Sequence, residues 1–240
     1  MTRTTPSHRL FLPDLDEADG PVSLGGEEAH HAVRVKRLRP GEAVELFDGR
    51  GRVLVGRVLG SNGSRANPEL AIEPVGEVEP VEPVRPQVEI CCPAPKGDRV
   101  ERMLDQLSQA GAARWRPLVC EHSEEIGVRR STRLERVIVE SAKQCGRAYL
   151  LEMGDPISFG SALEHPRVLV ADREAGATPA VRTTGEVRVL VGPEGGWSAE
   201  EFDRVRGMGV PMLPLGPHVL RLETAAVLAA AFVLAASRER

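Results

Sequence analysis

Aromatic residues and cysteines are scarce in this sequence, and long apolar runs are absent from it. Aromatic side chains make up 3% of the 240 residues, too few for a protein that binds nucleic acid mainly by stacking many bases. The longest apolar run is Ala225–Ala236, shorter than the roughly 20 residues that a membrane-spanning helix needs. The residues after Met1 also lack the apolar core of a secretion signal. We therefore expect a cytoplasmic protein that does not enter a membrane.

An excess of charge of one sign is also missing. The chain has 31 Lys and Arg residues against 35 Asp and Glu residues, a formal net charge of −4. This balance excludes a disordered polyelectrolyte and argues against indiscriminate binding to nucleic acid. Hydrophobic residues make up 41% of the chain, enough to fill the core of one large domain or two modest ones.

The cysteines follow neither a disulfide pattern nor a metal-binding pattern. Cys91 and Cys92 are adjacent, and no pair of cysteines has the C-x-x-C spacing of a zinc site. Cys120 and His122 are two possible ligands that lack a second pair. We therefore expect reduced cysteines and no bound metal.

A proline-rich stretch divides the chain. Residues 73–86 carry prolines at 74, 80, 83 and 86, a spacing that blocks a helix and interrupts a strand. We interpret this stretch as a semi-rigid extended connector. The sequence thus predicts one domain over residues 1–80 and a second over residues 81–240.

The first of these domains has the pattern of a small β-barrel. Residues 43–47 alternate between apolar and polar, Asp48-Gly49 is a turn signal, and residues 52–59 form the return strand of a hairpin. Residues 26–38 have apolar positions spaced as in one short helix, which Pro40 ends.

The second domain alternates strands with helices. Strands are expected at 88–92, 115–119, 168–171 and 187–191, and helices at 98–110, 132–145, 198–208 and 224–237. The later two strands are nearly continuous apolar runs, which is typical of strands buried on both faces. The pattern predicts an α/β fold with a parallel sheet covered by helices.

A glycine-rich loop follows the last of these strands. The glycines of Gly192-Pro-Glu-Gly-Gly196 let the backbone approach a ligand closely, at the edge of a parallel sheet where ligands bind. Ser198 and Glu201 have the spacing of a capping box. The loop is neither a dinucleotide fingerprint nor a Walker loop, and Glu194 favours a cation, a ribose or an amide donor. S-adenosylmethionine, which has a sulfonium centre, fits this loop; an ordinary tight turn is the alternative.

A second loop leads into the apolar C-terminal helix. It runs through Gly216-Pro217 to Leu220-Arg-Leu-Glu-Thr-Ala225, so that Arg221 and Glu223 lie where the helix begins. An acid at this end favours the helix dipole. If the strands are neighbours, the two loops form one pocket; a capping acid and a solvated arginine are the alternative.

The two loops together resemble the motifs of a known family. Gly192-Pro-Glu-Gly-Gly196 with Leu215-Gly216 and Leu220–Ala225 resembles the SPOUT superfamily of trefoil-knotted RNA methyltransferases. Within it, the chain is similar to the bacterial enzymes that methylate N3 of a uridine in 16S ribosomal RNA. Residues 28–41 and 46–49 are similar to the PUA-like barrel of those enzymes, and residues 95–98 and 140–147 match their middle motifs.

The resemblance implies a trefoil-knotted, parallel-sheet α/β methyltransferase domain preceded by a small PUA-like β-barrel, in a homodimer. It implies S-adenosyl-L-methionine as the cofactor, and 16S ribosomal RNA or the small ribosomal subunit as the partner. The residues expected to bind the cofactor are Leu190, Val191, Gly192, Pro193, Glu194, Gly195, Gly196, Leu215, Gly216, His218, Val219, Leu220, Leu222 and Thr224.

Methylation of uridine N3 requires the loss of a proton, and hence a base or a cation that stabilises negative charge. Arg221 is our first choice for the charge that develops on O2 or O4, and Glu194 or Glu223 for the proton. RNA phosphates need local basic residues, although a solvated basic surface is the alternative. The candidates are Arg34, Lys36, Arg37, Arg39, Arg129, Arg130, Arg133, Lys143 and Arg147.

One departure from the family keeps other functions open. Where the family has Lys-x-x-Glu-Leu-Gly, this chain reads Gln106-Leu-Ser-Gln-Ala-Gly111. The alternatives are a SPOUT enzyme that acts on another RNA nucleotide and a non-catalytic RNA-binding factor in ribosome assembly. Binding of S-adenosylmethionine distinguishes the enzyme from the scaffold.

Overall fold

The computed structural model describes residue 6 and residues 8–15, 20–64, 66–123, 131–173 and 183–237. Contacts within the chain separate it into two compact units. Unit 1 comprises residues 1–83 and 142–150, and unit 2 comprises residues 84–141 and 151–240.

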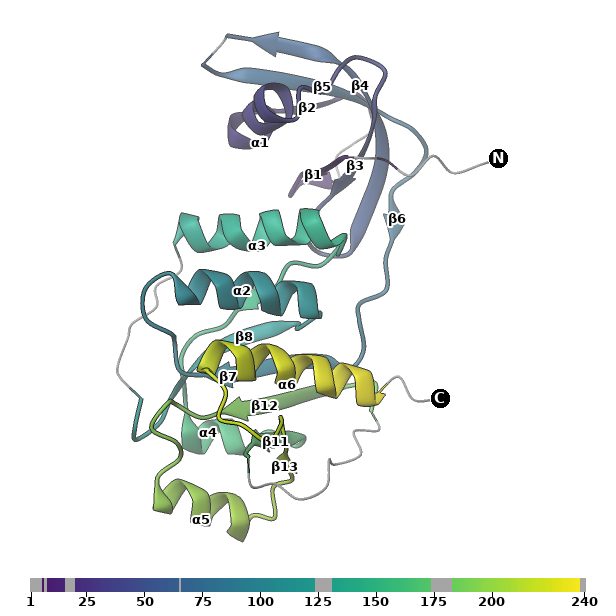
Figure 1. Ribbon diagram of the computed structural model, residues 1–240. Coiled ribbons are helices and arrows are strands. Elements are labelled where there is room, and N and C mark those ends of the chain that lie inside the picture. The colour runs from purple at the N-terminus through teal and green to yellow at the C-terminus, as the bar shows by residue number, and fades with distance from the viewer. Residues whose placement is uncertain are drawn as a thin grey trace. The chain divides into compact units, whose positions relative to one another are not determined.

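Unit 1 is built on a six-stranded sheet (Figure 1). The predicted hairpin is confirmed, because β3 pairs with β4 in antiparallel register and Val44 faces Gly56. Leu46 and Leu54 are fully or almost fully buried in the core on one side of this pair. The strands are β1 (His8–Phe11), β3 (Ala43–Phe47), β4 (Arg52–Gly63), β5 (Pro68–Pro74) and β2 (Val22–Leu24) in sheet order, with β6 (Glu79–Pro80) beside β4.

The helix of unit 1 is shorter than predicted. In place of one helix over residues 26–38, α1 (Gly26–His30) continues into one π-helical turn, η2 (His31–Val35). The Lys36 amide donates to the His31 carbonyl, which widens the turn. Arg37 then adopts a left-handed backbone with φ of 52°, and this conformation cannot continue a right-handed helix.

Residues 142–150 join unit 1 by backbone hydrogen bonds. The Gly51 amide donates to the Ala148 carbonyl, and the Leu150 amide donates to the Gly49 carbonyl. Gly51 has φ of 101°, and a Cβ atom there would lie 2.2 Å from the Tyr149 ring. Only glycine therefore fits at this close approach. Nothing in the composition indicated this return of the chain.

Unit 2 contains the predicted parallel sheet. Every pairing in it is parallel, and β12 lies between β7 and β11 although it follows both in the sequence. The trefoil knot that the resemblance implies stays a prediction. The sheet order is β10 (Ile157–Ser158), β8 (Arg114–Val119), β7 (Gln87–Cys92), β12 (Glu186–Val191), β11 (Val168–Ala171) and β13 (Met212–Leu213), with β9 (Glu152–Met153) beside β8.

Helices cover both faces of this sheet (Figure 1). On one face α2 (Arg99–Ala110) packs against α6 (Leu222–Ser237), and α6 contacts β7 and β12. On the other, α4 (Phe159–Leu163) and α5 (Ala199–Gly207) share a core with Cys91 and Leu190. The predicted helices in unit 2 are confirmed to within two residues, and α3 (Thr132–Cys145) has the predicted bounds. Across the described ranges, none of the helices has the length and apolarity to cross a bilayer.

Candidate functional site

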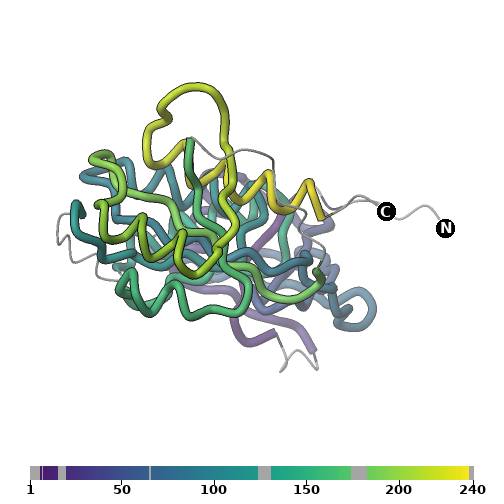
Figure 2. The backbone as a smooth tube through the Cα atoms, turned by 90° about the horizontal axis from the view of Figure 1, so that it is seen from below, coloured from purple at the N-terminus to yellow at the C-terminus, as the bar shows by residue number. Residues whose placement is uncertain are grey.

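A cavity of about 370 Å³ opens at the carboxyl ends of β11 and β12. The glycine loop after β12 forms one wall, and the segment between β13 and α6, a wide yellow-green loop in Figure 2, forms another. The structure thus brings together the two loops that the sequence predicts to share a pocket. The predicted residues that line it are Val191, Gly192, Pro193, Gly196, Leu215, Gly216, His218, Val219 and Leu220.

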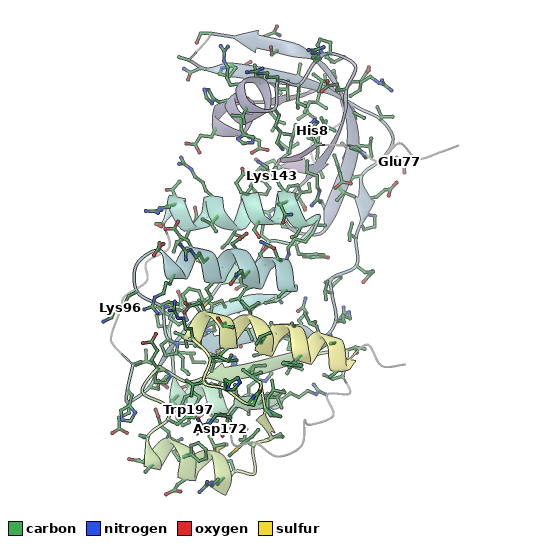
Figure 3. The ribbon with its side chains drawn as sticks, viewed as in Figure 1. His8, Glu77, Lys96, Lys143, Asp172 and Trp197 are labelled. Atoms are coloured by element: carbon green, nitrogen blue, oxygen red, sulfur yellow. The ribbon has the colours of Figure 1, made fainter. Side chains whose placement is uncertain are left out.

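Other lining residues were missing from the prediction. Asp172, which follows β11, and Trp197, which follows the glycine loop, both line this cavity (Figure 3). A Cβ atom on Gly192 would lie 3.0 Å from the indole ring of Trp197, so glycine lets the ring pack directly against the loop. The indole also packs on Phe159, with ring centroids 5.2 Å apart.

A capping box fixes the end of the glycine loop, as predicted. The Ser198 hydroxyl accepts from the Glu201 amide at 3.3 Å, and the Glu201 carboxylate accepts from the Ser198 amide at 2.9 Å. The second oxygen of buried Glu201 accepts from the Glu121 amide at 2.9 Å. In the same turn, His122 Nδ1 lies 3.1 Å from the Gly196 carbonyl oxygen. The turn after β8 is therefore held at one point against the glycine loop and at another against the first turn of α5.

A second cavity, of about 230 Å³, is also lined by this loop. Pro193 lines both cavities, whereas Glu194 and Gly195 line only the second. The two cavities therefore adjoin at Pro193 of this loop. The second cavity is lined by Pro93, Ala94, Pro95, Lys96, Arg99, His122, Ser123, Pro193, Glu194, Gly195 and Leu222.

Arg99 connects the two acids that the sequence nominated for proton transfer. Its Nη1 lies 2.9 Å from Glu194 Oε1 and 3.9 Å from Glu223 Oε2. The hydrogen bond to Glu194 is the main cause that raises the pKa of Arg99, so this guanidinium stays charged. Both carboxylates therefore have a cationic partner from α2 that the sequence analysis did not foresee.

The remaining predicted site residues lie outside the first cavity. Leu190 is fully buried in the core beneath the loop, and Leu222 lines the second cavity. Arg221 and Thr224 are exposed and line neither cavity. The roles assigned to all of these residues stay predictions.

Several predicted RNA-contacting residues have their charges exposed. Arg34, Arg37 and Arg39 are exposed in unit 1, while the Lys36 ammonium lies 3.3 Å from the Arg9 carbonyl oxygen. In α3, Arg133 is 74% exposed and pairs with Glu101 at 2.8 Å. The candidates Arg129 and Arg130 lie outside the described residues.

Lys143 and Arg147 are placed differently from the other basic candidates. The Lys143 side chain is only 3% exposed, and its Nζ lies 3.0 Å from Glu28 Oε2. Burial lowers the pKa of the Arg147 guanidinium, and the Arg147 carbonyl accepts from Arg9 at 3.0 Å. These placements argue against direct phosphate contacts by Lys143, whose charge is paired with Glu28 inside unit 1.

The two glutamines that depart from the family pattern, and the Cys120 thiol considered as a metal ligand, lie outside the two cavities. Gln106 is exposed, and the Gln109 amide donates to Asp105 Oδ1 at 2.9 Å within α2; neither residue lines either of the two cavities described above. Burial raises the pKa of the Cys120 thiol to about 11, so it stays protonated near neutral pH and is a poor metal ligand. Within the described ranges, no cluster of three or more metal-ligating side chains occurs.

Comparisons with known proteins place this geometry in context. The profile of the RNA methyltransferase domain matches residues 82–234, and that of the RNA methyltransferase PUA domain matches residues 24–66. A relative from Mycobacterium bovis, named ribosomal RNA small subunit methyltransferase E, is 32% identical over 239 residues, covering 92% of this chain and 88% of its own. A Synechocystis relative of the same name is 25% identical and covers 94% and 76%.

Solved structures agree with these sequence relatives. A putative methyltransferase from Legionella pneumophila, solved in complex with the bound cofactor SAM, is 25% identical with a TM-score of 0.79 and covers 97% of this chain and 99% of its own. A probable rRNA-methyltransferase from Porphyromonas gingivalis is 26% identical with a TM-score of 0.79, covering 96% and 98%.

Proposed function

This chain belongs to the RNA methyltransferase family that includes the ribosomal RNA small subunit methyltransferases E, and on this premise we propose its specific reaction. It transfers a methyl group from S-adenosylmethionine to N3 of a uridine in 16S ribosomal RNA. The observation that carries the proposal is the cavity between the two glycine-bearing loops. Its place at the carboxyl ends of parallel strands is where ligands of such sheets bind.

The first cavity has the chemistry that the methyl donor needs. Gly192 and Gly216 let the backbone approach a ligand, and Leu215 and Leu220 offer apolar surface to an adenine ring. Asp172 places a carboxylate in a cavity whose ligand carries positive charge on sulfur. When bound, S-adenosylmethionine supplies both the methyl group and the leaving group, so the protein supplies position and electrostatics.

Arg99 gives the two acids a role that differs from proton transfer. Glu194 belongs to the first loop, Glu223 follows the second, and both pair with Arg99. We assign these contacts to holding the loops at a fixed separation. Arg221 keeps its candidate role in stabilising charge on the uridine. Because Arg221 lines neither cavity, that role requires bound RNA or a second copy of the chain to bring the uridine and Arg221 together.

The proposed assembly is a homodimer that contacts RNA through its N-terminal domain. The α6 helix is apolar on nearly all sides, with Phe232 43% exposed, and Val219 in the loop before it is 79% exposed. Such apolar surface favours a partner. The match to a PUA domain and the exposed Arg34, Arg37 and Arg39 support RNA contact by residues 1–80. We place methyl transfer in residues 81–240, and the enzyme in the cytoplasm, where ribosomes assemble.

The reaction is tested by mapping methylated nucleosides. Small ribosomal subunits that lack the modification are incubated with the purified protein and labelled S-adenosylmethionine, and the RNA is analysed by mass spectrometry. We expect one N3-methylated uridine in 16S ribosomal RNA. A methyl group on another nucleotide would identify a different RNA methyltransferase, and failure to bind the donor in calorimetry would identify a non-catalytic factor.

A further inference from the structure

The second cavity is placed to present a ligand to the first. The two share Pro193 of the glycine loop, with Gly196 lining the first and Glu194 and Gly195 lining the second. A group bound beside Pro193 in the second cavity therefore adjoins a methyl donor bound beside Pro193 in the first. In-line transfer of a methyl group requires the two reacting atoms to meet within about 3–3.5 Å, and the shared wall at Pro193 is where the two cavities allow it.

The walls of the second cavity suit a flat, polar ring that carries a phosphate. Pro93, Pro95 and Leu222 supply apolar surface, and Lys96 and Arg99 bring positive charge. An enzyme that acts on a base takes that base out of its stack into such a pocket. Lysine and arginine side chains are also the groups that bind RNA phosphates and stabilise negative charge on ring oxygens.

His122 is held in one tautomer at this cavity. Its Nδ1 lies 3.1 Å from the Gly196 carbonyl oxygen, and a carbonyl only accepts, so Nδ1 carries the hydrogen. In the neutral ring Nε2 is then an acceptor. Among the described residues, Nε2 has no hydrogen-bond partner. The ring lies beside the loop at Gly195, where a Cβ atom would be 3.4 Å from the His122 Cβ, an ordinary contact distance.

We propose that the second cavity binds the uracil base that receives the methyl group and that His122 Nε2 accepts the proton from its N3. This inference rests on the proposed function and adds the acceptor site and the base to it. The two acids nominated from the sequence already pair with Arg99. Imidazole is the side chain that most often serves as a general acid or base in enzymes, and the Nε2 of this ring is an acceptor in its neutral form.

The step balances without a further reactant. The N3–H bond breaks and its proton passes to Nε2, while the electron pair of N3 forms the bond to the methyl carbon. The bond between that carbon and sulfur breaks, and its electrons stay on sulfur in the neutral thioether product. His122 is exposed and returns its extra proton to water. The negative charge that develops on O2 or O4 faces Lys96 and Arg99.

The base is tested by H122N, because the asparagine amide can still donate to the Gly196 carbonyl but cannot take a proton. We expect kcat to fall about 100-fold or more, with the affinity for S-adenosylmethionine unchanged in calorimetry. RNA with 5-fluorouridine at the target recovers most of this loss, since its N3–H is more acidic. H165N, the same change at the far end of the sheet, is the matched control and keeps the wild-type rate.

The cavity is tested separately by A94F, which fills it without changing His122. We expect methylation to fall at least about 10-fold while donor binding is retained, because the acceptor base is excluded. An unchanged rate in A94F overturns the acceptor site. An unchanged rate in H122N, or an equal loss on uridine and 5-fluorouridine RNA, overturns the role of His122. If the wild-type protein methylates no uridine, the proposed function itself fails instead.

Discussion

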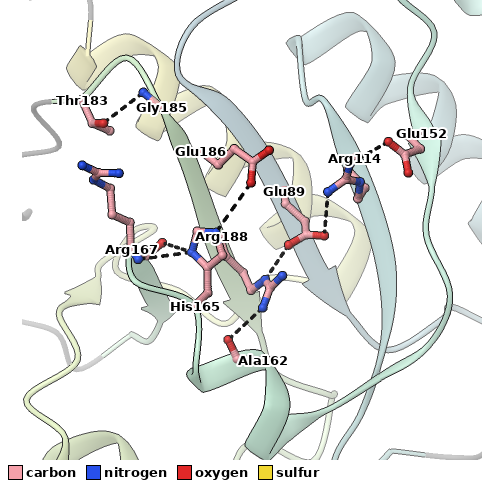
Figure 4. A network of polar contacts seen from close by, with 10 residues as sticks. All are labelled: Glu89, Arg114, Glu152, Ala162, His165, Arg167, Thr183, Gly185, Glu186 and Arg188. Atoms are coloured by element: carbon pink, nitrogen blue, oxygen red, sulfur yellow. Dashed lines mark hydrogen bonds and ion pairs between the residues drawn. The ribbon is translucent and has the colours of Figure 1, made fainter.

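The two ends of the parallel sheet in unit 2 use polar residues in opposite ways. At the carboxyl ends, glycine loops leave two cavities, and His122, Asp172 and Lys96 line them. At the amino ends, Glu89 of β7 and Arg188 of β12 bond to each other (Figure 4). The same strands therefore begin in a closed ionic network and end in an open site.

The ionic network links side chains from several strands. Glu89 accepts from Arg188 and also lies 3.7 Å from Arg114 Nη1. Arg114 in turn pairs with Glu152 at 2.8 Å, and Arg188 donates to the Ala162 carbonyl at 3.3 Å. Charges with partners on several sides fix the strands relative to one another, whereas polar groups that line a cavity can contact a ligand there. Stability and function are thus separable along one strand.

The largest expected effect comes from breaking this network with Glu89→Gln. The Glu89 and Arg188 side chains are only 8% and 11% exposed, and removing one partner of a buried pair costs about 3–5 kcal/mol. We expect the free energy of unfolding in urea to fall by about this amount, with the donor affinity of the folded protein unchanged. Glu186→Gln, at a 60% exposed neighbour, is the control, with a change under about 0.5 kcal/mol. Equal losses of stability in both variants would contradict a stabilising role specific to the buried ionic network.

At the carboxyl end, we expect Gly192→Ala to weaken donor binding more than it lowers stability, the reverse of Glu89→Gln. The new Cβ would lie 3.0 Å from the Trp197 ring, so the indole or the loop must shift by a few tenths of an ångström. We expect the affinity for S-adenosylmethionine to fall by about tenfold, which equals about 1.4 kcal/mol, and the stability to change less than the affinity. Calorimetry and urea unfolding measure the two quantities. Gly207→Ala, where nothing lies within 4 Å of the new atom, is the control.

A smaller effect, on both stability and donor affinity, is expected from Ser198→Ala. The change removes the hydroxyl that caps α5, which costs about 1 kcal/mol of stability. Because the cap also ends the glycine loop, we expect donor affinity to fall two- to threefold, roughly 0.5 kcal/mol. Ser158 caps α4 in the same way and lines neither cavity. As the control, Ser158→Ala should lower stability without weakening donor binding.

The sequence predicted the loops well and their neighbours poorly. The glycine loop, the capping box of Ser198 and the β3–β4 hairpin follow from local rules of backbone freedom and hydrogen bonding. Arg99 and His122 reach the site from other strands and helices, through a sheet order in which β12 lies beside β7. Local spacing carries no information on that order.

The ionic network has a signal in the sequence. Glu89 and Arg188 are the single charges within the apolar runs 88–92 and 187–191, and a charge inside a buried strand needs a partner. Two such strands with opposite charges predict a pair between neighbours. The π-helical turn at His31–Val35 had no comparable signal, because its apolar spacing is equally compatible with an α-helix.

The smallest expected effect concerns the departure from the family pattern in α2. Gln106 is exposed and Gln109 bonds only to Asp105 in the preceding turn, so the double variant Gln106→Lys with Gln109→Glu restores the family's charges without touching either cavity. We expect a stability change within about 0.5 kcal/mol and a donor affinity equal to that of the wild type. A rise in methylation of more than about threefold at low salt, lost at high salt, would show instead that this face of α2 contacts RNA. The amides would then mark a weakened RNA contact on this face of α2, a functional surface apart from both ends of the sheet.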